Sequence, residues 1–107
     1  MKNYTNLILD DFLAAIKRNP HALIIDVRTL NEYNDYHLPN AINIDIKHTD
    51  FEEDINELNH DAHYYVYCSL GIRSANACTY MRQQGFRYVY NLKKGLKNGT
   101  GVLTRPI

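Results

Sequence analysis

The chain has 107 residues, of which 45% are hydrophobic and 22% are charged. This length suits one compact domain over residues 1–107, and the composition is globular rather than disordered or collagenous. The 12 basic and 12 acidic residues cancel, so we expect no general attraction to nucleic acid or to an anionic membrane. No apolar run has secretory or membrane-spanning length, which predicts a cytoplasmic protein, and a monomer is the default for a neutral domain of this size.

The first half of the chain alternates between helical and strand patterns. Residues 10–19 begin with two acids and carry apolar side chains three and four positions apart, which predicts a helix. The apolar run 22–25 predicts a strand that is buried on both faces. Residues 29–36 again have helical spacing and residues 41–44 are mostly apolar, so we expect a short helix, a turn and a second strand.

The second half repeats this alternation. Residues 50–58 have one apolar face among acids, which predicts a helix, and residues 63–67 (HYYVY) favour a strand. A helical pattern then runs from residue 73 to Gly85, a residue that often ends helices, and residues 86–90 predict the last strand. The sequence therefore predicts an α/β fold, with a mainly parallel central sheet and helices on both faces. The glycine-rich segment 92–107 is expected to form a coil or a short helix near the active edge.

Cys68 lies at the most informative position, directly after one predicted strand and shortly before a helix. Ligands of open α/β sheets collect beyond the carboxyl ends of the strands, and helix N-termini favour negative charge. Gly71 permits a close backbone approach, while Arg73 and Ser74 add a cation and a hydroxyl that could cap the helix. These neighbours favour a thiolate, so we interpret Cys68 as a nucleophile. The alternative is a thiol buried in the core, which is the favoured interpretation for Cys78 within the helix.

The two cysteines do not form a CxxC motif, and the five histidines have no zinc-ligand spacing relative to them. We therefore expect neither a metal site nor a disulfide, and the sequence indicates no cofactor.

Three motifs in the same order and spacing resemble those of the rhodanese-like sulfurtransferases, in their single-domain form. The first is an aspartate-valine-arginine signature, the second surrounds the cysteine, and the third closes the domain. They comprise residues 25–28 with 32–33 and 37–44, residues 67–74 with Ala77 and 85–86, and residues 89–92 with Gly95.

This resemblance implies a sulfane-sulfur carrier. The Cys68 thiolate would attack a donor such as thiosulfate or a persulfide, hold the outer sulfur as a persulfide, and pass it to cyanide or to a thiol, including a protein thiol. Amides of the loop from Ser69 to Arg73 would surround the sulfur, and Arg73 would contact a sulfonate-like group. The substrate-binding residues implied in this way are Ser69, Leu70, Gly71, Ile72, Arg73 and Ser74.

The charged residues of the first motif mostly hold the fold in the resembling family. Asp26 stands at a strand end and can accept amides from the next turn, and Arg28 is spaced i, i+4 from Glu32. His37 could cap or buttress a turn. We therefore expect structural support rather than direct chemistry from Asp26, Arg28, Glu32 and His37.

The chain departs from the family pattern where glycines are usual. Tyr36 precedes the motif histidine, Asn40 follows the proline, and Lys94 lies in the closing segment. Asn40 can adopt a left-handed conformation, so the fold should tolerate it. A position that often carries tryptophan corresponds to Gly99. Lys93 and Lys94 add positive charge near the site, although adjacent lysines are more often a solvated surface feature.

Two other functions remain open. A phosphatase or arsenate reductase also uses a cysteine, a loop and an arginine to hold an oxyanion. Four residues separate Cys68 from Arg73, whereas the phosphatases that share this fold use five, so this ring favours a single sulfur atom. The second alternative is a non-catalytic module that binds a partner or senses persulfide.

Overall fold

The computed structural model describes residues 4–96, in which five strands alternate with four helices. Along the chain these elements are β1 (Thr5–Leu7), α1 (Leu9–Arg18), β2 (Leu23–Asp26), α2 (Leu30–Asp35), β3 (Ile42–Asn43), α3 (Phe51–Asn56), β4 (His63–Tyr67), α4 (Ile72–Gln83) and β5 (Tyr88–Leu92). The strands form one sheet in the order β1-β5-β4-β2-β3, and every neighbouring pair is parallel. The predicted α/β fold is therefore confirmed. The expectations for residues 97–107, including Gly99, lie outside the described residues.

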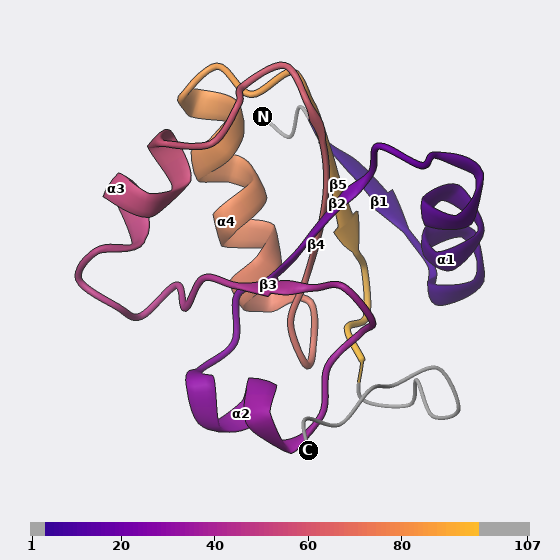
Figure 1. Cartoon of the computed structure of the whole chain (residues 1–107), viewed down its shortest axis with the longest axis horizontal. Coiled ribbons are helices and arrows are strands. Elements are labelled where there is room, and N and C mark those ends of the chain that lie inside the picture. The colour runs from indigo at the N-terminus through magenta and orange to yellow at the C-terminus, as the bar shows by residue number, and fades with distance from the viewer. Residues whose placement is uncertain (1–3, 97–107) are drawn as a thin grey trace.

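The sheet separates two layers of helices (Figure 1), with α1 on one face and α3 and α4 on the other. The residues of β4 alternate between the two cores, because successive strand side chains point to opposite faces. Tyr64 and Val66 pack with the core beneath α4, while Tyr65 and Tyr67 pack with Phe12 of α1. This double burial explains why the central strands lack polar side chains over most of their length.

The connections from the two central strands diverge. The chain leaving β2 passes through α2 to β3 on one side, whereas the chain leaving β4 passes through α4 to β5 on the other. In open α/β sheets, ligands bind at such a topological switch, which here lies beyond the carboxyl ends of β2 and β4. Figure 1 shows the loop between β4 and α4 at this edge, next to α2.

The bounds of β2 and β3 differ from the sequence prediction by one residue at each end, and two other strands differ more. The edge strand β1 was not expected, because three residues with two polar side chains carry no recognisable period. The last strand was predicted at residues 86–90 but runs from Tyr88 to Leu92. Phe86 instead ends the preceding helical segment, where its N–H donates to the Met81 carbonyl at 3.0 Å.

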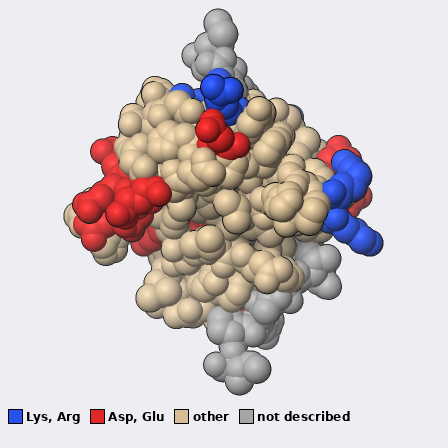
Figure 2. Space-filling view, turned by 45° about the horizontal axis from the view of Figure 1, so that its top comes forward, with Lys and Arg blue, Asp and Glu red and all other residues tan. Residues whose placement is uncertain are grey.

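Charged side chains form a few groups on the surface, and only one of them is wholly acidic in the view of Figure 2. Figure 2 shows acidic residues at one side, over α3, whose first turn contains Glu52, Glu53 and Asp54. Basic and acidic residues lie together on the opposite side. The helix α1 carries both, with Asp10 and Asp11 in its first turn and Lys17 and Arg18 in its last. None of the helices within residues 4–96 is long and apolar enough to cross a bilayer.

Candidate active site

The sulfur of Cys68 is surrounded by polar hydrogen-bonding groups of the loop that follows β4. The backbone N–H groups of Gly71 and Ser74 donate to Sγ, at 3.1 and 3.3 Å. The thiol lies 3.3 Å from the Ser74 hydroxyl oxygen, to which it donates. The residue is only 1% exposed, and α4 begins four residues later with its N-terminus at this loop. Cys68 therefore belongs to the buried core, while its sulfur accepts hydrogen bonds from two backbone amides.

This geometry corrects two details of the sequence interpretation. The helix begins at Ile72 rather than at Arg73, and its N-cap, Gly71, makes no side-chain capping bond. Ser74 consequently does not cap the helix, and its hydroxyl is used at the sulfur instead. The expected donors to the sulfur were the amides from Ser69 to Arg73. The recorded donors to Sγ are the amides of Gly71 and Ser74, and Ser74 lies beyond that loop.

The segment that follows β5, residues 93–96, packs against the loop that follows β4. Gly71 has φ of 91°, and a Cβ built on it would lie 2.1 Å from the carbonyl oxygen of Lys93. A Cβ on Gly95 would lie 2.2 Å from the carbonyl oxygen of Ser69. The N–H of Leu96 donates to the Cys68 carbonyl at 3.0 Å. Two backbone segments are thus packed so closely that only glycine fits at both contacts.

Glu32 of α2 holds both ends of the same loop. Its carboxylate accepts from the two terminal nitrogens of Arg73, at 2.7 and 3.0 Å, and from the Ser69 hydroxyl at 3.1 Å. It also accepts from the backbone N–H of Thr29, which makes a reciprocal capping box at the start of α2. The hydrogen bond from Arg73 is the main reason why the pKa of Glu32 falls to about 2. Arg73 therefore pairs with Glu32 through both of its terminal nitrogens, and its side chain is 25% exposed.

The expected pairing of Arg28 with Glu32 is wrong. Arg28 instead forms a buried ion pair with Asp26, at 2.7 Å, and donates to the backbone oxygen of Tyr36. Burial lowers the pKa of Arg28, but the hydrogen bond to Asp26 and the charges of Asp26, Tyr67 and Glu32 together outweigh it, and the pKa is raised. Asp26 does accept the backbone N–H of Arg28 at 2.9 Å, as its place at a strand end predicted.

Tyr67 completes this buried network and was not singled out from the sequence. Its hydroxyl donates to Asp26 at 2.8 Å and accepts the N–H of Leu38 at 3.0 Å. Burial, followed by the charge of Asp26, raises the pKa of Tyr67. A tyrosine directly before Cys68 looks like an ordinary strand residue, so the sequence offers no signal for this role. The Thr29-x-x-Glu32 capping box, in contrast, was a recognisable signal.

His37 and Asn40 shape the turn between α2 and β3. The His37 ring stacks on Tyr33 with centroids 3.9 Å apart, and its Nδ1 lies 2.9 Å from the Tyr33 carbonyl oxygen. Asn40 has φ of 66°, the left-handed conformation that its sequence position suggested. Neither residue contacts Cys68 in the bonds that the structure records, so both belong to the framework around the site.

Cys78 is fully buried in the core between α4 and the sheet, as expected. Burial, and secondarily the charge of Cys68, raises the pKa of its thiol. A protonated, enclosed thiol is a poor nucleophile. The structure thus distinguishes the two cysteines by their surroundings.

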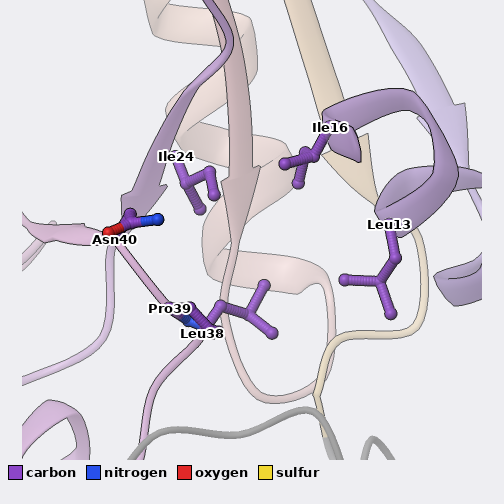
Figure 3. Close-up of a pocket in the computed structure, with 6 residues that line it drawn as sticks. All are labelled: Leu13, Ile16, Ile24, Leu38, Pro39 and Asn40. Atoms are coloured by element: carbon purple, nitrogen blue, oxygen red, sulfur yellow. The ribbon is translucent and has the colours of Figure 1, made fainter. Parts of the chain in front are cut away.

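A hollow of about 230 Å³ lies away from the sulfur, between α1 and β2. Figure 3 shows Leu13 and Ile16 of α1 pointing toward Ile24 and Leu38, with Pro39 and Asn40 at the far side. The lining is mostly apolar, and it offers no nucleophile or titratable group. Within residues 4–96 no three histidine, cysteine or acidic side chains gather as a metal site would require.

Comparison with known proteins agrees with the fold. A profile described as rhodanese-like domain matches residues 9–100. The putative sulfur carrier protein YrkF of Bacillus subtilis is 33% identical over 93 residues, which cover 87% of this chain and 49% of YrkF. A tRNA uridine(34) hydroxylase of Buchnera aphidicola is 36% identical over 97 residues, which cover 78% of this chain and 30% of the hydroxylase. The chain thus spans about half, or less, of these curated relatives.

A crystal structure of a rhodanese-like domain protein from Staphylococcus aureus superposes with a TM-score of 0.82 and 25% sequence identity. The superposition covers 96% of this chain and 99% of that one. Because the profile spans most of the sequence and the solved structure matches almost end to end, the chain belongs to the rhodanese-like domain family.

Proposed function

We propose that the chain is a sulfurtransferase that carries one sulfane sulfur on Cys68. In the first half-reaction the thiolate attacks the outer sulfur of thiosulfate or of a donor persulfide. A bond forms between Sγ and that sulfur, the donor's S–S bond breaks, and sulfite or a thiolate leaves with the electron pair. In the second half-reaction cyanide or an acceptor thiolate takes the outer sulfur, and the electron pair returns to Sγ.

The observation that carries this proposal is the pair of amides directed at Sγ, from Gly71 at 3.1 Å and Ser74 at 3.3 Å. A hydrogen bond to a charged acceptor contributes about 1.5–3 kcal/mol, so these donors favour the thiolate over the thiol. The Ser74 hydroxyl can rotate to donate once the thiol loses its proton. The N-terminus of the 12-residue helix α4 adds a favourable dipole. The same donors are placed to stabilise the charge of a persulfide.

Arg73 contributes through the shape of the loop in this proposal. With both terminal nitrogens on Glu32, it fixes the end of the loop while Ser69, also bound to Glu32, fixes its start. Leu70 and Ile72 lie between these ends with exposed side chains and form the entrance for the donor. Asp26, Arg28 and His37 do not contact the sulfur in this proposal. Asp26 and Arg28 hold the end of β2, and His37 holds the turn that follows α2.

The rival phosphatase or arsenate reductase activity is less well supported. Four residues lie between Cys68 and Arg73, and the arginine that would bind an oxyanion is already paired with Glu32. A persulfide-sensing module remains distinct, since it would load sulfur but release it slowly. Its signature would be a stable adduct with no measurable second half-reaction.

Intact mass spectrometry after incubation with thiosulfate tests the proposal. Wild type and Cys78→Ser should gain the mass of one sulfur atom, and cyanide should remove it. Cys68→Ser should gain nothing. An adduct that persists in Cys68→Ser but is lost in Cys78→Ser would refute the site assignment. Release of phosphate from an aryl phosphate ester, without sulfur loading, would favour the rival activity.

The setting we propose is the cytoplasm, with residues 1–107 acting as a single monomeric domain. A persulfide carrier depends on an unpaired thiol. Both cysteines are free, and a reducing compartment keeps thiols in that state. Size-exclusion chromatography with light scattering checks the monomer.

A further inference from the structure

Among the described residues that bond the sulfur of Cys68, only Ser74 brings a group that can reverse its hydrogen bond. Its hydroxyl oxygen lies 3.3 Å from Sγ and accepts from the thiol. The backbone N–H groups of Gly71 and Ser74, in contrast, are donors in every state of the sulfur. A hydroxyl can rotate, so it accepts from a thiol and donates to a thiolate. Within residues 4–96 the structure records no other hydrogen-bond partner for this hydroxyl.

Ser74 approaches the sulfur from the buried side of α4. It is 0% exposed, and it shares a helix face with three other fully buried residues of α4, Ala77, Cys78 and Met81. Ile72, two positions earlier in the same helix, is in contrast largely exposed. A sulfur atom added to Sγ must stay within reach of donors and acceptors from solution, so it has to extend away from the enclosed side. The Ser74 hydroxyl is therefore directed at Sγ rather than at the outer sulfur.

The negative charge at the site moves during the proposed reaction. In the resting thiolate it lies on Sγ, whereas a persulfide anion carries most of it on the outer sulfur. When an acceptor removes the outer sulfur, the S–S bond breaks and its electron pair returns to Sγ. A better stabilised thiolate leaves faster in such exchanges, but it is also a weaker attacking nucleophile. A donor fixed at Sγ therefore speeds the release of sulfur more than its uptake.

We propose that Ser74 is a catalytic residue of the unloading half-reaction, in which its hydroxyl donates to Sγ as the outer sulfur leaves. This inference rests on the proposed sulfur transfer at Cys68. With cyanide as acceptor, the cyanide carbon forms a bond to the outer sulfur, the S–S bond breaks, and thiocyanate leaves while Sγ keeps the electron pair. The serine proton stays on its oxygen, so the step needs no base, oxidant or reductant. The hydroxyl thus favours release of the sulfur over its storage.

Ser74→Ala and Ser74→Gly test the proposal, because both remove the hydroxyl and keep the backbone N–H of residue 74. The full chain is mixed with thiosulfate and sulfite at fixed ratios, at a pH where the loading rate has reached its plateau. Sulfite reverses loading, so the loaded fraction from intact mass spectrometry reports an equilibrium. Without a donor that prefers the thiolate, the ratio of loaded to unloaded protein should rise about tenfold, which corresponds to about 1.4 kcal/mol. Release of sulfur to cyanide should slow several-fold, while loading from thiosulfate should not slow.

Ser74→Thr keeps the hydroxyl and should restore the wild-type ratio. Thr79→Ala is the matched control, since Thr79 is exposed on the same helix and its hydroxyl donates to the Ala75 carbonyl instead of to the sulfur. A purely structural role of Ser74 would slow loading and unloading together. That result, or an unchanged equilibrium ratio without the hydroxyl, would overturn the role of Ser74 while loading of wild type still supported sulfur transfer. Absence of any persulfide on wild-type Cys68 would overturn both.

Discussion

Gly71 should be irreplaceable because of a contact rather than only because of its backbone conformation. Gly71 and Gly85 have nearly the same φ, 91° and 93°, so alanine at either position costs about 1–2 kcal/mol for the left-handed conformation. The Cβ of alanine at 85 meets nothing within 4 Å, whereas at 71 it would lie 2.1 Å from the Lys93 carbonyl oxygen. Relieving such a clash adds about 1–3 kcal/mol. We expect Gly71→Ala to lose about 2–5 kcal/mol of unfolding free energy.

Urea denaturation of wild type, Gly71→Ala and Gly85→Ala measures this difference, and the rate of sulfur loading from thiosulfate measures its effect on the site. Because the Gly71 amide donates to Sγ, the shift that relieves the clash should also slow loading in Gly71→Ala, while Gly85→Ala loads at the wild-type rate. Equal loss of stability in the two variants would show that the close approach to Lys93 is not what demands glycine. A Gly71→Ala protein that loads sulfur normally would show that this amide is dispensable.

Three further predictions concern the polar groups around the loop. The pKa of Glu32 is lowered from 4.5 to about 2, so its carboxylate stabilises the fold fully above about pH 4.5 and loses this effect as the pH falls toward 2. Thermal melts should therefore show a steeper loss of stability over that interval in wild type than in Glu32→Gln, and parallel curves would contradict it. Asp26→Asn leaves Arg28 buried without its counter-charge and should cost about 3–5 kcal/mol in urea denaturation; a loss below 1 kcal/mol would mean that water reaches the pair. Tyr67→Phe removes a partner from both Asp26 and the Leu38 amide, so we expect a loss of about 1–3 kcal/mol, and an unchanged midpoint would argue against the network.

The sequence predicted the elements that carry strong periods and missed those that depend on distant partners. β2 and β4 were recognisable because a strand buried on both faces must be almost wholly apolar or aromatic. β1 was invisible, since its three residues become a strand only by pairing with β5 at the other end of the chain. The last strand was placed two residues early because Phe86 has strand propensity, although the structure uses it to close α4.

The candidate site shows the same contrast between local patterns, which the sequence reveals, and contacts between distant segments, which it does not. The position of Cys68 and the need for Gly71 could be inferred from local order along the chain. The partner of Arg73 could not, because Glu32 lies 41 residues away and local spacing suggested Arg28 instead. The hydroxyl of Ser74 was assigned to a helix cap by residue type, whereas three-dimensional proximity directs it to the sulfur. Side-chain partners between segments are decided by the fold, and short-range patterns do not encode them.

The parallel sheet also determines what can be joined to this domain. β1 starts at the edge away from Cys68, whereas the chain leaves β5 beside it, with Leu96 bonded to the Cys68 carbonyl. A protein fused directly after Leu96 would therefore start beside Cys68, and one fused directly before Tyr4 would start at the far edge of the sheet. Tethering of the first kind can raise the local concentration of an attached thiol into the millimolar range. Engineered chimaeras that relay sulfur within one polypeptide should accordingly place their receiving module after this domain.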